Sequence, residues 1–181
     1  VAKTHGVPSI GYVSPQVWAW RASRAKGIHE VFDHLLCLFS FEPDLFPGTD
    51  TAWVGHPVID RLPARGRVDS TLFGLAPGSR PQEFERMRTP FLETAARIRE
   101  TVPDAHFRLL SPIDPGPLPE WISHITDVRS LSTARGVLTK SGTITLELAV
   151  MGVPQVVAHR VHPLTHQLGR MLVQGIDHIA M

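Results

Sequence analysis

Short apolar runs alternate along this sequence with longer segments in which apolar residues recur every three or four positions. The short runs predict β-strands, and the longer segments predict amphipathic helices. Strand and helix in alternation indicate βαβ units and a parallel sheet. The expected strands are residues 9–13, 34–39, 52–54, 71–76, 106–110, 136–139 and 155–159, and the expected helices are residues 18–31, 41–46, 84–98, 143–151 and 164–173.

Proline and glycine divide this pattern. Residues 61–70 (RLPARGRVDS) are polar and rich in arginine, which predicts a linker between a first domain, residues 1–60, and a second domain, residues 71–181. Residues 111–120 are rich in proline and are expected to form a loop. Pro90 lacks an amide hydrogen, so we expect the helix around it to break near Arg88 and restart at the proline.

Composition excludes several classes of protein. Of 181 residues, 43% are hydrophobic and 19% are charged, as in a globular protein. The net charge of +1 gives no strong field for nucleic acid, so no nucleic-acid partner is expected. No stretch reaches the length of a membrane span. The single cysteine, Cys37, lies in an apolar run, which favours a buried hydrophobic role over a nucleophile and a reducing cytoplasm as the location.

The segment KSGTITLE combines the features of an anion site. The strand before it ends at Ser141-Gly142-Thr143, where a helix is expected to begin. Backbone N–H groups and the positive end of the helix dipole attract anions there, and a glycine allows close approach of a phosphate. Glu147 lies one helical turn further and is placed to accept hydrogen bonds from ribose hydroxyls. Ordinary helix capping by serine or threonine explains the segment about equally well.

A second strand-to-helix turn, Pro77-Gly78-Ser79-Arg80, precedes Glu83. Arginine at such a turn can pair with a pyrophosphate through two hydrogen bonds. Taken alone, the turn is better explained as a tight turn with a solvated arginine. Two such turns in one domain favour a shared phosphate site.

The first domain carries aromatic and basic residues that suggest a second substrate. Trp18 and Trp20 cannot both face one core stripe of a helix, so one is expected at a rim that could cover a sugar or an acyl chain. One core tryptophan and one partly exposed tryptophan without a ligand is a fair alternative. Arg21 and Arg24 lie nearby, either as a solvated face or as a phosphate contact of an acceptor. His56, between glycine and proline, is more often a turn residue than a catalytic one.

No metal is expected. His162 and His166 have a four-residue spacing, but the glutamate that accompanies this spacing in a metal motif is missing.

Together, these motifs resemble the lipid-A-disaccharide synthase family. The resemblance rests on YVSPQVWAWR (residues 12–21), Arg24, Phe41-Glu42, Gly55-His56-Pro57 with Asp60, PGSR (residues 77–80) with Glu83, and SGT (residues 141–143) with Leu146-Glu147, all in the family's order. The tryptophan motif is quite specific, whereas SGT followed by glutamate is shared more widely among transferases that use UDP-sugars.

The resemblance implies a GT-B fold of two Rossmann-like parallel-sheet domains, both incomplete in this chain, with the acceptor on the first and the UDP-sugar on the second. It implies transfer of 2,3-diacylglucosamine from UDP to a lipid monosaccharide 1-phosphate, giving a β-1,6-linked disaccharide and UDP, with no metal or other cofactor. Donor-site residues would be Ser79, Arg80, Ser141, Gly142, Thr143 and Glu147, and acceptor-side residues Trp18, Trp20, Arg21, Arg24 and His56.

The resemblance also implies a peripheral enzyme of the bacterial inner membrane. The substrates carry acyl chains, and the apolar stripe of residues 164–173 could enter the interface, although core packing explains such a stripe better. An exposed sheet edge would favour association into a homo-oligomer.

The chain departs from the family in lacking a glycine-rich first strand-turn-helix and a proposed catalytic aspartate, which would precede Val1. The catalytic base is therefore unassigned. Alternatives are another UDP-sugar enzyme of the GT-B type, an epimerase, or a truncated, non-catalytic remnant.

Overall fold

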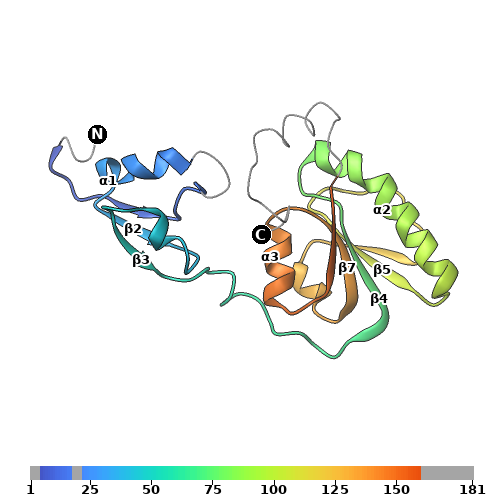
Figure 1. The fold of residues 1–181 in the computed structure, drawn as a ribbon. Helices are drawn as coiled ribbons and strands as arrows, with labels where there is room; N and C mark the ends of the chain where they lie inside the picture. Colours follow the sequence, from blue (N-terminus) through green and yellow to red (C-terminus); the bar gives the residue numbers. More distant parts are fainter. Residues whose placement is uncertain (1–4, 18–21, 160–181) are drawn as a thin grey trace. The chain divides into compact units, whose positions relative to one another are not determined.

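The computed structural model describes residues 5–17 and 22–159, and it confirms an α/β protein with parallel sheets (Figure 1). The chain folds into two compact units. Among the described residues, the first unit ends at Pro57 and the second begins at Val58. The segment 61–70 contacts the second unit, because the Gly66 amide donates to the Ser132 carbonyl and Leu62 packs on that unit's core.

The first unit contains a three-stranded parallel sheet in the order β1-β2-β3. Leu35 and Cys37, on the buried face of β2, pack with Phe46 and form the centre of its core. The apolar run predicted at residues 34–39 is therefore a central strand. The strands are β1 (Ile10–Tyr12), β2 (His34–Cys37) and β3 (Asp50–Trp53), joined by the 3-10 helices η2 (Ala22–Gly27) and η3 (Pro43–Leu45) and by α1 (Ile28–Val31).

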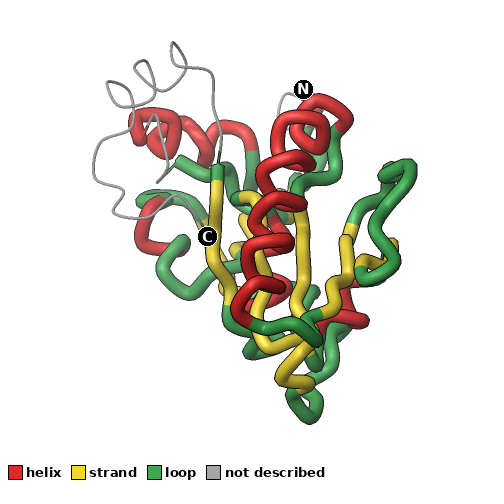
Figure 2. Tube along the Cα trace, turned by 90° about the vertical axis from the view of Figure 1, so that its right-hand side faces the viewer, coloured by secondary structure: helices red, strands yellow, loops and turns green. Residues whose placement is uncertain are grey.

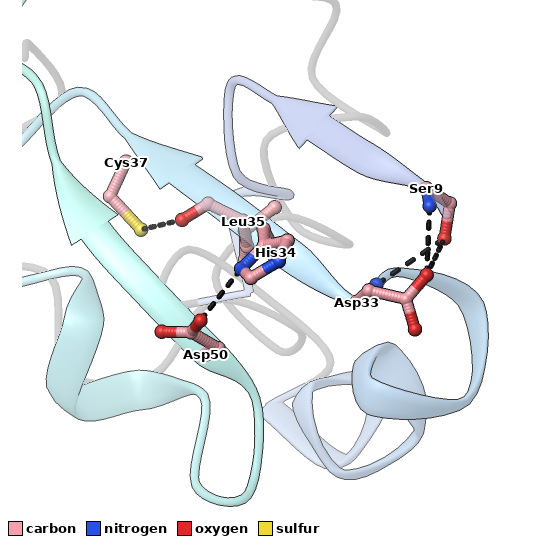
Figure 3. Close-up of polar contacts among 6 residues, drawn as sticks. All are labelled: Ser9, Asp33, His34, Leu35, Cys37 and Asp50. Atoms are coloured by element: carbon pink, nitrogen blue, oxygen red, sulfur yellow. Dashed lines mark hydrogen bonds and ion pairs between the residues drawn. The ribbon is translucent and has the colours of Figure 1, made fainter.

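Polar side chains fix the starts of these strands, as Figure 3 shows. The Asp33 carboxylate accepts hydrogen bonds from the amide and the hydroxyl of Ser9, at 2.8 and 3.0 Å. His34 Nδ1 lies 2.6 Å from a carboxylate oxygen of Asp50 on the neighbouring strand. Cys37 is fully buried, and burial raises the pKa of its thiol, which confirms the interpretation of Cys37 as a core residue.

The second unit is built on a five-stranded sheet in the order β6-β5-β4-β7-β8, with every neighbouring pair parallel. The predicted strands of this unit are confirmed to within two residues at each end. The sequence pattern did not predict β6 or the short helix η4. The elements are β4 (Asp69–Ala76), α2 (Pro81–Thr101), β5 (His106–Leu110), β6 (Ile122–Ile125), η4 (Val128–Leu131), β7 (Ala134–Lys140), α3 (Thr143–Val150) and β8 (Gln155–Ala158).

Helices α2 and α3 cover opposite faces of this sheet (Figures 1 and 2). Successive side chains of a strand point to opposite faces, so β4 contributes to both cores. Leu75 packs with Phe84 and Phe91 of α2 on one face. On the other face, Leu72 packs with Leu148 of α3. The hydrophobic layers on the two faces of the sheet therefore fix the positions at which β4 and β7 end.

The predicted break at Pro90 is wrong. Helix α2 runs without interruption from Pro81 to Thr101, with Pro90 inside it. Buried side chains on both sides of the proline, Met87 and Phe91, belong to the same core. Their burial holds the two halves in one register and outweighs the hydrogen bond that proline cannot donate.

A loop, rather than a helix, connects the parallel strands β5 and β6. The proline-rich segment was expected to be a loop, and between Leu110 and Ile122 it contains neither helix nor strand. Parallel neighbours usually need a longer crossover, often a helix that covers the sheet. Here Ile113, Leu118 and Trp121 pack on the core instead, so the loop covers part of the sheet.

Candidate functional site

The candidate site lies where the chain order of the second sheet reverses. From β4 the chain proceeds through α2 to β5 on one side of β4, whereas β7 and β8 lie on its other side. Strands β4 and β7 are paired in parallel up to Ala76 and Thr139, so their carboxyl ends lie side by side. In open α/β sheets, ligands bind beyond the carboxyl ends of the strands at such a switch point.

The two turns predicted to bind phosphate follow these two strand ends directly. Residues 77–80 connect β4 to α2, and residues 141–142 connect β7 to α3. The structure therefore brings Ser79 and Arg80 to the same edge of the sheet as Ser141, Gly142 and Thr143. This juxtaposition depends on strand order, which the sequence pattern alone does not give.

Glu83, in the first turn of α2, links the two turns. Its Oε1 atom lies 3.1 Å from a guanidinium nitrogen of Arg80 and 2.9 Å from Nζ of Lys140. The Lys140 side chain is 15% exposed and the Arg80 side chain 80% exposed, so the arginine is the more accessible cation. Hydrogen bonds and charge from Lys140, and then from Arg80, lower the pKa of Glu83, which therefore stays ionised.

His159 stands at the end of the next strand, β8, whose Ala158 pairs with Lys140. Burial lowers the pKa of His159, the positive charge of Lys140 lowers it further, and Glu83 partly offsets both effects. His159 therefore shares an electrostatic environment with Lys140 and Glu83. The neutral imidazole is favoured there near neutral pH.

The start of α3 has the properties expected of an anion site. The N-cap residue of this eight-residue helix is Gly142, which has no side chain to cap it. The amide and the hydroxyl of Thr145 both donate to the Gly142 carbonyl, at 3.0 and 2.7 Å, which fixes the turn and directs that carbonyl into the helix. A Cβ built on Gly142 would meet no atom within 4 Å, so the space in front of this backbone is open.

Glycine has a different role in the other turn. Gly78 has a φ of +131°, a conformation that side-chain-bearing residues rarely adopt, and a Cβ there would lie 3.0 Å from Cβ of Glu83. The backbone conformation itself therefore requires glycine at position 78. At position 142, by contrast, the described structure leaves room for the methyl group of an alanine.

The other predicted site residues are placed as follows. Glu147 lies on α3, half-buried, one turn beyond Thr143, and its contact with ribose stays a prediction. In the first unit, the His56 ring lies 6.0 Å from the ring of Phe39. Arg24 lies in η2, and its side chain is not described. Trp18, Trp20, Arg21, His162, His166 and the helix expected at residues 164–173 lie outside the described residues.

Two further residues at this edge of the sheet, Lys140 and His159, were not predicted as site residues from the sequence. Lys140 precedes the SGT turn directly, and His159 ends the following strand. Their positions at the carboxyl ends of predicted strands were the available signal. Their proximity to Glu83 follows only from the order of the strands.

The described part of the chain has neither a metal-binding cluster nor a membrane-spanning helix. Among residues 5–17 and 22–159, no group of three or more His, Cys, Asp or Glu side chains is placed to hold a metal ion. In the same ranges, no helix is long and apolar enough to cross a membrane.

A parallel α/β sheet, with both faces covered and two polar turns at its switch point, defines a Rossmann-like protein. The family is equally clear from comparison with known sequences. The family model described as lipid-A-disaccharide synthetase matches residues 2–115 and 121–180. The chain belongs to this family.

Curated relatives agree with this assignment. The chain is similar to the lipid-A-disaccharide synthase of Geobacter sulfurreducens, with 36% identity over 100% of this chain and 53% of the relative. The synthase of Syntrophotalea carbinolica is 33% identical over 99% of this chain and 52% of the relative. The synthase of Burkholderia vietnamiensis is 35% identical over 93% of this chain and 50% of the relative. The chain thus spans about half the length of the curated relatives it matches.

Proposed function

We propose that the chain is part of a glycosyltransferase that binds a UDP-sugar at the β4–β7 switch point. The reaction is transfer of 2,3-diacylglucosamine from UDP to a lipid monosaccharide 1-phosphate, which forms a β-1,6-linked disaccharide and releases UDP. The second unit binds the donor and the first unit contributes to the acceptor side, as in a GT-B arrangement. Because both substrates carry acyl chains, the enzyme would act at the cytoplasmic surface of the inner membrane.

The convergence of two turns on one edge of one sheet supports this proposal best. A diphosphate needs several donors that lie close together, and each turn supplies a different kind. The residue 77–80 turn supplies the exposed guanidinium of Arg80. The residue 141–142 turn leads into the start of α3, whose N-cap residue is Gly142, and the first amides of a helix with the positive end of its dipole attract an anion.

The same groups would act in the chemical step. When the acceptor hydroxyl displaces UDP from the anomeric carbon, negative charge develops on the leaving diphosphate. Arg80 and the N–H groups of α3 would stabilise this charge because they are fixed before the reaction starts. By analogy with oxyanion-hole deletions, each such donor would contribute about 2.7–4 kcal/mol to transition-state stabilisation.

Isothermal titration of UDP into the chain tests the binding part of the proposal. Arg80→Ala should weaken UDP binding by about 10-fold to 100-fold, because a charge-assisted hydrogen bond contributes roughly 1.5–3 kcal/mol. Arg97→Ala, which removes an exposed arginine from the distant half of the same helix, is the matched control and should bind UDP normally. Equal affinities for the wild type and Arg80→Ala would contradict the role of Arg80.

A transfer assay tests the chemical part in an enzyme that contains both substrate sites. With a UDP-linked diacylglucosamine donor, Arg80→Ala should strongly reduce turnover, and the product should be a disaccharide. A product that is an epimerised sugar nucleotide, with no disaccharide, would overturn the proposed reaction.

A further inference from the structure

Lys140 is held at the candidate site in an unusual way for a lysine. It is the last residue of β7, and its side chain is only 15% exposed, whereas lysine side chains are mostly exposed. Lys140 shares a face of its strand with Leu138, which packs on the core beneath α2. The ammonium group therefore lies beside the first turn of α2, where Glu83 accepts its hydrogen bond at 2.9 Å.

The charges in this cluster do not cancel. One carboxylate, that of Glu83, interacts with the two cations Arg80 and Lys140 through the same oxygen atom. His159 is a third titratable neighbour of Glu83, and its lowered pKa favours its neutral form. The cluster thus keeps a net positive charge near neutral pH, at the strand edge that also carries the open space in front of Gly142.

A purely structural ion pair would not need a second cation. An ammonium that only joined α2 to β7 would be satisfied by Glu83 alone. Glu83 instead contacts two cations, Lys140 at the end of β7 and Arg80 in the residue 77–80 turn, and the Arg80 side chain is 80% exposed and therefore accessible to a ligand. This arrangement keeps two positive groups ready for an anion that carries more than one charge.

We propose that Lys140 is a further donor-binding residue whose ammonium group contacts the diphosphate of the sugar nucleotide, with Glu83 as the residue that positions it. The inference rests on the proposed function, since it assigns a new residue to the same site. Lys140 recognises the diphosphate and not the nucleoside. Its contribution should therefore depend on ligand charge.

Titration calorimetry with UDP and with uridine tests this assignment. Lys140→Met keeps the length of the side chain and removes the charge. It should weaken UDP binding by about 10-fold to 100-fold, as expected for the loss of one charge-assisted hydrogen bond, and leave uridine binding unchanged. Lys140→Arg keeps the charge and should retain most of the UDP affinity. Arg97→Met removes a positive charge far from the site and should bind both ligands like the wild type.

The outcomes separate the two proposals. If the wild type binds UDP and Lys140→Met binds it equally well, the role of Lys140 is wrong while the donor site stands. If Lys140→Met weakens UDP and uridine binding to the same extent, the lysine is structural and the inference also fails. If the wild type binds no UDP, the proposed function itself fails. Circular dichroism of each variant, compared with the wild type, shows that a loss of binding is not a loss of fold.

Discussion

At the scale of single residues, the described structure gives no reason for glycine at position 142. Its backbone is extended, with φ 165° and ψ −172°, and any residue adopts such a φ. A Cβ would meet no atom within 4 Å. Nothing in the described structure therefore excludes alanine. A phosphate lying against the backbone at the start of α3 would exclude it.

Gly142→Ala should consequently separate stability from binding. We expect a melting temperature within about 2 °C of the wild type, because an unstrained surface substitution changes stability by roughly 0.5 kcal/mol or less. UDP affinity should fall at least about 10-fold, because the added methyl group occupies the space of the phosphate. Differential scanning calorimetry and UDP titration provide the two measurements.

Gly78→Ala is the matched comparison for this prediction. Its φ of +131° and the 3.0 Å approach to Glu83 predict a clear loss of stability. Wild-type UDP affinity in Gly142→Ala would show that no phosphate lies against this backbone.

At the scale of secondary structure, helix α2 shows tertiary contacts overriding a local signal. Proline in a helix interior costs about 3 kcal/mol relative to alanine, and Pro90 lies in the middle of a 21-residue helix. Phe84, Met87, Phe91 and Ala95 are all nearly inaccessible and line one face of the helix. Their burial outweighs the cost of the proline, which local sequence signals cannot reveal.

Pro90→Ala should therefore stabilise the protein. Alanine restores the amide donor to the helix, and we expect the free energy of unfolding of the second unit to rise by about 1–3 kcal/mol, reduced somewhat by the greater entropy of the unfolded chain. Urea denaturation followed by circular dichroism measures the change. A lower midpoint would mean that the proline ring makes packing contacts that offset the missing hydrogen bond.

The elements also show how far the sequence could predict this molecule. Apolar runs and their spacing predicted β4, β5, β7 and α3 because each buries side chains in the core, and they also predicted β8, although Val156 and Val157 in it are exposed. Strand β6 was missed because the polar residues Ser123 and His124 interrupt its apolar pattern. The two turns that we propose to bind phosphate were identified from their motifs. Lys140 and His159 were not selected, because only strand order places them beside Glu83.

At the scale of the whole molecule, several carboxylates of the second unit have lowered pKa values. Hydrogen bonds from Lys140 lower the pKa of Glu83, those from Thr71 lower that of Asp69, and those from Arg129 lower that of Asp127. Each group binds its proton less readily in the native state than in the unfolded state. The stability that they contribute is therefore present above their unfolded pKa values, which are about 4.

The second unit should accordingly lose stability as the pH falls through and below about 4. His159 acts in the same direction at higher pH. Its lowered native pKa means that the unfolded state takes up a proton first as the pH falls below about 6.5. Thermal melts at pH 7, 5 and 3 should show a falling midpoint, and Glu83→Gln should reduce the acid part of this fall. A midpoint that rises toward pH 3 would contradict the assigned interactions.

The central claim is that the residue 77–80 and residue 141–145 segments bind one diphosphate together. Hydrogen exchange of the wild-type chain, measured by mass spectrometry with and without saturating UDP, tests it most directly. We predict slower amide exchange in both segments on addition of UDP and no change in the proline-rich loop between β5 and β6. Bound UDP that slows exchange in only one of the two segments, or in neither, would contradict the claim.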